Sequence, residues 1–317
     1  MLTCAAAVVA PIAGAQTLSG NSLRVGVGGD GSLINSADTS QTPDAFNSQW
    51  SVNPGIIWDG SGTGNFSVNN DFITPGTPFQ MYSIGVGSNY ATASFINNAD
   101  SGYSAGGWAP QLGGTTVQTG TRSTVTTGSY GGLDYSQTLS FGASSSSINF
   151  GITLTNNSAS DISGVSFATG LDPDPDVYQY EASSSSDVYN TINQVISPGV
   201  VEATGPLTGN SIFIQDVSGG GTASIIGNWP QFDPTTKGLL TSGENDGNGD
   251  FSIFDDWQVG TIAAGTSTTI NYNYIINATP VGVGGTIPTV PDGGATLAMV
   301  AAAFTGLAIM RRRMVRA

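Results

Sequence analysis

The feature that most constrains the fold is an alternation of apolar with polar or small residues. It is clearest at residues 133–141, 148–154 and 270–276. Successive side chains of a β-strand point to opposite faces, so this period of two predicts half-buried antiparallel strands. No segment before residue 295 shows a 3.6-residue period, and helix is therefore expected to be scarce.

Turn signals separate these segments and indicate the fold class. The chain contains 45 glycines in 317 residues, about twice the usual share of ~7%. Glycine clusters, Pro75-Gly76 and Asn156-Asn157 interrupt the strand patterns, as expected of tight turns. Shorter strands are predicted at residues 23–27, 79–86, 123–127, 165–169, 211–217 and 223–229. Residues 16–280 are therefore predicted to be an all-β antiparallel β-sandwich, either one large double-sheet domain or two sub-sandwiches.

Part of this body resembles a known kind of sandwich. The segment from Ile152 to Ser158, the Asp172-Pro173-Asp174 run and the turn at residues 264–266 resemble Ig-like β-sandwich units of bacterial surface proteins. The resemblance covers about half of the body and implies a surface-exposed sandwich.

Charge is scarce and unevenly distributed. The chain has 22 Asp and Glu against 7 Lys and Arg, and four of those seven lie in the last seven residues. The remainder has 22 acids against 3 bases, a net charge of 3 − 22 = −19. So acidic a surface repels phosphate backbones, which argues against nucleic-acid binding, whereas it attracts divalent cations.

Two absences narrow the chemistry further. The sequence contains no histidine, which excludes Ser-His-Asp and Cys-His catalysis and histidine-ligated zinc or haem. Its one cysteine, Cys4, lies in the predicted leader. No local motif marks a catalytic carboxylate pair, and no Ser-x-x-Lys ends at Lys237. We therefore expect a protein that is not an enzyme.

The N-terminus predicts export. Residues 2–12 are mostly Ala, Val and Leu, and Ala13-Gly14-Ala15 provides a small-x-small cleavage pattern before Gln16. This is typical of the apolar region and cleavage site of a signal peptide, here residues 1–15. No basic residue follows Met1, so the true start codon is expected upstream. The alternative is a buried N-terminal helix.

The C-terminus has three parts in a fixed order. The residues Val290, Pro291, Asp292, Gly293 and Gly294 precede an apolar stretch at 295–310 and the basic cluster Arg311, Arg312 and Arg313. This order resembles the PEP-CTERM/exosortase sorting tail, in the variant whose motif begins Val-Pro-Asp-Ser-Gly. Gly293 departs from it by standing where that variant has serine. The resemblance implies an exosortase-type partner that cuts near the motif, after which the body is released or attached to the envelope.

The length of the apolar stretch agrees with a temporary anchor. Sixteen helical residues rise roughly 24 Å, less than the ~30 Å hydrocarbon core of a bilayer. The arginines are expected to remain cytoplasmic and the acidic body outside. Residues 281–289 are expected to be a Gly/Pro/Thr-rich linker. A permanent C-terminal membrane anchor remains the alternative.

Two acidic runs suggest calcium as a cofactor. Asp172, Asp174 and Asp176 alternate with prolines, and Asp246, Asn248 and Asp250 have the one-three-five spacing of a calcium loop. The second run departs from the EF-hand pattern, since Phe251 occupies the glycine position and Trp257 replaces the last glutamate. The alternative for both runs is a solvated turn.

Tryptophans suggest a carbohydrate partner. Trp58 precedes Asp59, and Trp257 follows Asp255-Asp256, so each could stack on a sugar ring beside carboxylates that bind hydroxyls. Burial in the core is the commoner fate of tryptophan. We therefore expect an exported cell-surface or extracellular-matrix protein, the alternative being a carbohydrate-binding module or a polysaccharide-acting enzyme displayed on the envelope.

Overall fold

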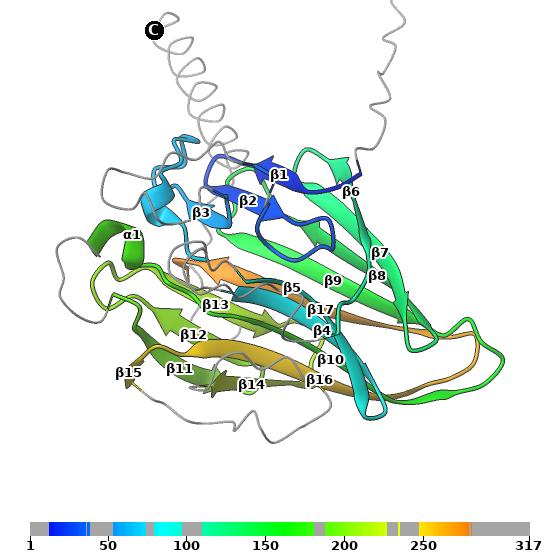
Figure 1. The fold of residues 1–317 in the computed structure, drawn as a ribbon. Coiled ribbons are helices and arrows are strands. Elements are labelled where there is room, and N and C mark those ends of the chain that lie inside the picture. The colour runs from blue at the N-terminus through cyan, green and yellow to red at the C-terminus, as the bar shows by residue number, and fades with distance from the viewer. Residues whose placement is uncertain are drawn as a thin grey trace, which may run out of the picture. The chain divides into compact units, whose positions relative to one another are not determined.

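Strands dominate the computed structural model, which describes residues 13–35, 37–38, 53–73, 79–96, 110–180, 188–226, 234, 247–278 and 280. The chain divides into one compact unit, Met1–Ala278, and a second, Thr279–Ala317. The described strands of the first unit form three antiparallel sheets (Figure 1). The described helices are α1, Val177–Tyr180, and the 3-10 turn η1, Val68–Asn70.

The largest sheet has nine strands in the order β15-β11-β12-β13-β17-β9-β8-β7-β6. Its strands are β6 (Thr115–Gly120), β7 (Ser123–Tyr130), β8 (Leu133–Ser140), β9 (Ser147–Thr155), β11 (Thr191–Ser197), β12 (Val200–Thr204), β13 (Ser211–Asp216), β15 (Gly247–Gly249) and β17 (Ser267–Ile276). The alternating segments at 133–141, 148–154 and 270–276 become its adjacent central strands β8, β9 and β17.

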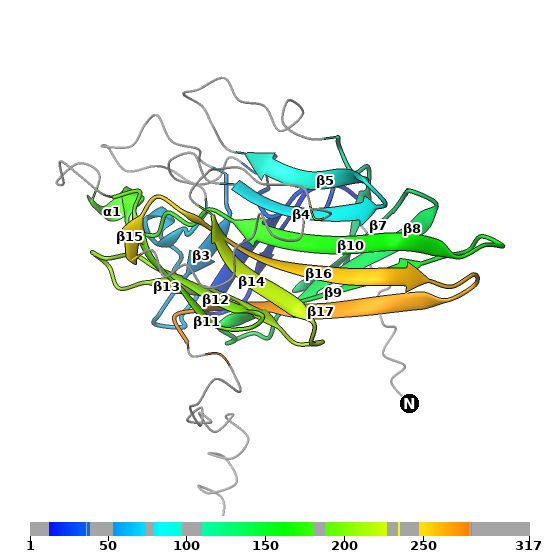
Figure 2. The same ribbon diagram turned by 90° about the horizontal axis from the view of Figure 1, so that it is seen from below.

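A second sheet has five strands in the order β14-β16-β10-β4-β5, and Figure 2 shows them side by side. They are β4 (Phe79–Val86), β5 (Asn89–Ile96), β10 (Ile162–Leu171), β14 (Gly221–Ile226) and β16 (Ser252–Ile262). The central strand β10 pairs with β4 on one side and β16 on the other.

An aromatic cluster packs these two sheets against each other. Phe150 of β9 stacks on Tyr272 of β17, with ring centroids 4.7 Å apart. From the five-stranded sheet, Phe167 and Trp257 lie 5.9 Å and 5.7 Å from the Tyr272 ring. These rings are buried, and aromatic pairs at such distances add to the free energy gained from area burial.

The third sheet is small and closes one side of the core. It consists of β1 (Gln16–Ser19), β2 (Leu23–Val27) and β3 (Ile56–Trp58). Leu18, Leu23 and Val25 belong to the same buried cluster as the aromatic rings. A polar link adds to the packing, since Tyr82 donates a hydrogen bond to the Asp30 carbonyl at 2.6 Å.

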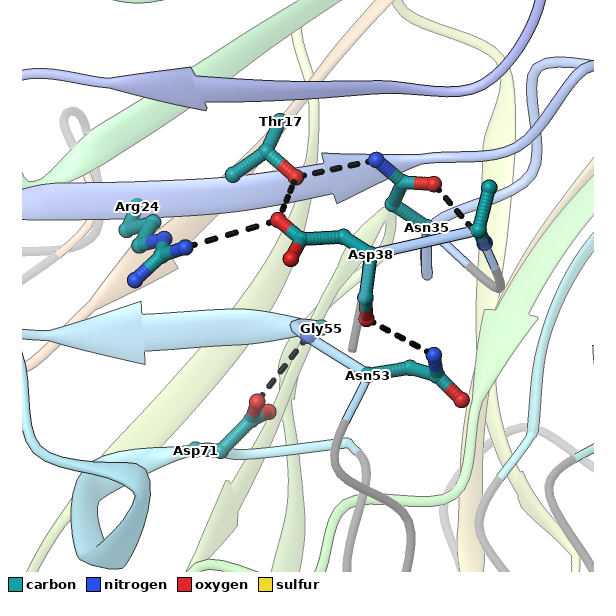
Figure 3. A network of polar contacts seen from close by, with 8 residues as sticks. Thr17, Arg24, Asn35, Asp38, Asn53, Gly55 and Asp71 are labelled. Atoms are coloured by element: carbon teal, nitrogen blue, oxygen red, sulfur yellow. Dashed lines mark hydrogen bonds and ion pairs between the residues drawn. The ribbon is translucent and has the colours of Figure 1, made fainter. Parts of the chain in front are cut away.

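Polar side chains hold the loops around the small sheet (Figure 3). Asp38 accepts a hydrogen bond from Thr17 at 2.6 Å and forms an ion pair with Arg24 at 3.4 Å. Asp71 accepts hydrogen bonds from the backbone N–H groups of Gly55 and Ile56. Arg24, one of the few cations outside the tail, is thus used to fix a loop.

The sequence predicted the fold class correctly. An all-β protein with antiparallel, sandwich-like sheets is confirmed, and β2 and β4 have the predicted bounds. No helix of the described residues is long and apolar enough to cross a bilayer. The helix expected at 295–310 and the linker at 281–289 lie outside the described residues.

The inter-sheet aromatic cluster predicts a large effect of truncation. Replacement of Phe167 by alanine is expected to lower the free energy of unfolding by about 3–5 kcal/mol, because it leaves a cavity between the sheets. Urea denaturation of the variant measures this loss. Val217→Ala, at a side chain that is 56% exposed, is the matched control and is expected to change stability by less than about 0.5 kcal/mol. Equal effects of the two substitutions would contradict the assignment of the core.

Candidate functional site

The outward side of four neighbouring strands forms a surface that we name the hydroxyl face. It comprises most of the solvent-exposed or half-exposed side chains on the outward side of β7, β8, β9 and β17, which are hydroxyl or amide side chains except at three positions; Ile275, on the same side of β17, is buried. Its members are Ser123, Val125, Thr127, Ser129, Asp134, Ser136, Thr138, Ser140, Asn149, Gly151, Thr153, Thr155, Ser267, Thr269, Asn271 and Asn273. Asp134 is the only charged residue in these four strands.

Strand register places these residues in rows across the sheet. One row runs Thr127–Ser136–Thr153–Thr269, because each residue is the partner of the next in the antiparallel ladders. The Thr153 and Thr269 hydroxyls lie 2.8 Å apart. Neighbouring side chains on one face of a sheet stand close enough to act together on a ligand.

A groove lies at one end of the hydroxyl face. It is open to solvent, has a volume of about 480 Å³ and is lined by Thr127, Gly128, Ser129, Asp134, Tyr135, Ser136, Thr155 and Asn157. Asn157 donates a hydrogen bond to the Asp134 carboxylate at 2.6 Å, which orients both groups at the wall. The groove therefore presents donors and acceptors without a positive charge.

The two predicted acidic runs meet at the ends of two paired strands. Leu171 at the end of β10 pairs with Ile253 at the start of β16, so that Asp172 follows one strand where Asp250 precedes the other. Asp172 and Asp174 are buried, whereas Asp250 is exposed. Burial, and then the charge of Asp250, raise the pKa of Asp172 well above its ordinary value. Burial and the charges of Asp172, Asp250 and Asp176 do the same to the pKa of Asp174.

Asp176 has a different role from its neighbours. Its carboxylate accepts hydrogen bonds from the backbone N–H groups of Leu207 and Thr208, at 2.8 Å and 2.9 Å, and from the Thr208 hydroxyl. These hydrogen bonds hold the backbone of the turn at residues 205–209 in place. Asp246 lies outside the described residues, and the structure does not describe the side chain of Asn248.

A second pair of carboxylates, one buried and one half-exposed, lies beside Gly221 of β14, and the sequence did not predict this pair. A Cβ atom on Gly221 would lie 2.7 Å from Asp255 Oδ1 and 2.9 Å from Asp216 Oδ2, so both groups border this glycine. Asp255 is fully buried, and neither of its oxygens has a hydrogen-bond partner among the described residues. Asp216 accepts hydrogen bonds from the N–H groups of Ser218, Gly219 and Gly221.

The two tryptophans singled out by the sequence have different surroundings. Trp257 is buried against Phe167 and Tyr272, so the prediction that it stacks on a sugar is wrong, because neither ring face is accessible. Trp58 is half-buried and retains an accessible part. The adjacent Asp59 accepts hydrogen bonds from Ser61, Thr63 and Asn65, and these bonds, that from Ser61 above all, lower its pKa.

Comparison with known protein families supports an assignment for the C-terminus. Residues 289–314 match the VPDSG-CTERM motif. The chain carries a C-terminal sorting tail. The match contains the predicted motif at 290–294, with Gly293 in the serine position, and supports an exported, envelope-associated protein that meets a sorting enzyme at the membrane. No curated protein matches the sequence.

Similarities to solved structures concern the fold. A protein described as an aldose 1-epimerase from Escherichia coli K12 is 14% identical with a TM-score of 0.41, over 83% of this chain and 99% of that one. A protein described as a kojibiose phosphorylase from the human microbiome is 8% identical with a TM-score of 0.39, over 82% of this chain and 29% of that one. A polysaccharide lyase is 12% identical with a TM-score of 0.33, over 85% and 33%. This chain thus spans about a third of the last two proteins.

These comparisons bear on two predictions. The resemblance of the body to Ig-like units is not confirmed; the similar structures include proteins described as an aldose 1-epimerase and a galactose mutarotase-like protein. The prediction that the chain is not an enzyme is contradicted, because three of the similar structures have the names of enzymes that act on carbohydrates. At these low identities the similarities assign no activity to this chain.

The buried carboxyl group of Asp255 predicts a dependence of stability on pH. Burial, and then the charges of Asp216 and Asp256, raise its pKa well above its ordinary value. An acid whose pKa is raised by folding stabilises the protein most below its unfolded pKa of about 3.9, and this contribution is lost as the pH rises toward the folded pKa. Asp255→Asn is therefore expected to stabilise the fold at pH 7, because the amide carries no charge that has to be buried.

Thermal melts from pH 4 to pH 8 measure this effect. The Asp255→Asn variant is expected to lose less stability than the unmodified protein as the pH rises. Ser163→Asn, at an exposed position of β10 that carries no titratable group, is the control and is expected to keep the original slope. An unchanged slope in Asp255→Asn would show that Asp255 is not desolvated in the folded protein.

Proposed function

We propose that this exported protein binds neutral extracellular polysaccharide through the hydroxyl face. The observation that carries the proposal is the composition of that face: four neighbouring strands expose Ser, Thr and Asn in register, with Asp134 as the only charge. Typical soluble domains contain about 25% charged residues, whereas this chain contains 9% and these four strands contain one charged residue. We therefore interpret the near absence of charge over four exposed strands as the mark of a surface that binds an uncharged ligand.

The chemistry of these side chains suits sugars. Hydroxyl and amide groups both donate and accept hydrogen bonds, as sugar hydroxyls do. Ser, Thr and Asn are short, so less side-chain entropy is lost on binding than with Lys or Glu. An open sheet with a groove at one end accommodates an extended chain without requiring a closed pocket. Neutral polysaccharide is favoured over acidic polysaccharide because the body has a large negative charge.

Export and sorting place such a surface where polysaccharide occurs. The tail supports delivery to the envelope. We propose that a processing enzyme of the exosortase type reads residues 290–294 and that Arg311, Arg312 and Arg313 stay on the cytoplasmic side until cleavage. The half-buried Trp58 is a further residue that we propose to stack on a sugar.

Two substitutions in the middle of the hydroxyl face test the binding proposal. Ser136→Lys with Thr153→Lys places two long charged side chains in one row of the face. We expect affinity for neutral polysaccharide, measured by affinity electrophoresis against a panel of neutral and acidic polymers, to fall at least about tenfold, or ~1.4 kcal/mol. The matched control is Ser163→Lys, at an exposed position of β10 in the other sheet, and it is expected to bind normally.

The same samples test alternative outcomes. Absence of binding to every polymer, or equal loss in the control variant, would contradict the proposal. Release of reducing ends or of unsaturated products during incubation would show that the protein acts on the polymer as an enzyme. Circular dichroism melts of all variants verify that each is folded.

The tail is tested separately in the native host. Deletion of residues 290–317 is expected to abolish processing and sorting, so that the product is no longer retained by the envelope. Gly293→Ser, which restores the serine of the motif, is the control and is expected to be processed. Cell fractionation with mass spectrometry of the C-terminus measures both results. Normal retention of the truncated product would contradict the role of the tail.

A further inference from the structure

We propose that Asp172, Asp174 and Asp250 bind a calcium ion that ties the end of β10 to the start of β16. The proposal concerns a site separate from the hydroxyl face and does not depend on polysaccharide binding. In the folded chain, two segments that are distant in sequence bring three carboxylates to one end of a strand pair.

The strand pair brings the backbones of all three residues to the same end of the sheet. Because Leu171 and Ile253 are partners in the β10–β16 ladder, the chain leaves β10 at the point where it enters β16. The backbone of Asp174 is held in place by a hydrogen bond from its N–H to the Phe72 carbonyl at 2.8 Å. Pro173 and Pro175 restrict the backbone between the acids. The segment is thus rigid, and its ordering costs little on binding.

An unsatisfied oxygen points to a ligand at this place. Asp174 is only 2% exposed, and its Oδ1 has no hydrogen-bond partner among the described residues. The Ser252 hydroxyl, which is also fully buried, lies close enough to Asp172 to lower the pKa of that carboxyl. Buried polar atoms are nearly always satisfied, so atoms of this kind mark the position of a missing partner.

The charges at this end favour a cation as that partner. The charges that act on Asp172 and Asp174 are those of other carboxylates, and Arg24 is paired with Asp38. Two buried carboxylates with a third beside them repel one another strongly. A divalent ion would convert this repulsion into attraction and link the two segments.

Calcium is the ion that these ligands suit best. The donors are oxygens of carboxylate and hydroxyl groups, which are hard ligands, and calcium tolerates irregular geometry where magnesium requires an octahedron. As the side chains stand in the described part of the chain, no three acidic groups surround a common point. Binding of a calcium ion therefore requires the side chain of Asp250 to rotate toward Asp172 and Asp174. The side chain is exposed and has room to do so. Calcium sites of extracellular modules bind in the range of about 10⁻⁴–10⁻³ M.

Thermal melting of the full-length protein tests the site. We expect the melting temperature to rise by several degrees when millimolar calcium replaces chelator, and to rise less with magnesium. Asp174→Asn is expected to abolish the response to calcium. In chelator this variant is expected to be at least as stable as the unmodified protein, because one of the repelling charges is gone. A merely structural role of Asp174 predicts the opposite, a loss of stability in chelator.

A surface variant and a control keep the test decisive. Asp250→Asn changes an exposed residue and cannot disrupt the core, and it is expected to weaken calcium binding at least about tenfold in isothermal titration. Asp134→Asn, an exposed acid on the hydroxyl face, is the control and is expected to bind calcium normally. Absence of a calcium response in the unmodified protein, or a response in Asp174→Asn and Asp250→Asn as large as that of the unmodified protein, would overturn the proposal. Polysaccharide binding measured in chelator distinguishes failure of this site from failure of the hydroxyl face.

Discussion

The stacking of aromatic rings between the two larger sheets is the interaction on which the other features of this protein depend. Phe150 and Tyr272 from one sheet meet Phe167 and Trp257 from the other. Since successive side chains of a strand alternate between faces, these contacts determine which residues of β9, β10, β16 and β17 point inward. A shift of one residue in register would bury the threonines of β9 and expose its aromatic ring.

The same alternation assigns two kinds of chemistry to two regions. Along β9 and β17 the outward positions hold hydroxyl and amide groups, so the sheet presents a nearly uncharged surface. At the end of β10 the pattern stops, and the carboxyl groups of Asp172 and Asp174 lie buried just beyond the end of the β10–β16 strand pair. An acidic chain with few cations has little means to neutralise such groups internally. The proposed neutral ligand on the open face and the proposed divalent cation at the strand end both agree with this charge balance.

The sequence predicted the features that depend on a local residue pattern, but it did not predict those that depend on which strands pair with each other. The strands around Leu139, Ile152 and Tyr272 were predictable because a period of two is visible in the residues themselves. The proximity of Asp250 to Asp172 was not, because it follows from the β10–β16 ladder and not from spacing. Burial of Trp257 was equally hidden, since a tryptophan next to two aspartates resembles a sugar-binding pair until the face of its strand is known. The hydroxyl face required knowledge of the strand order, although its scarcity of charge was visible in the sequence.

The most direct test of which side chains point outward is the reactivity of single cysteines introduced along β8. The chain's only cysteine is Cys4, so in a Cys4→Ser background each introduced thiol reports one position. Cysteines that replace Ser136, Thr138 and Ser140 are predicted to react rapidly with a maleimide in the folded protein, and cysteines that replace Gln137 and Leu139 are predicted to be protected. Uniform reactivity along the strand, or protection at the serine and threonine positions, would contradict the assignment of an outward hydroxyl face and an inward core.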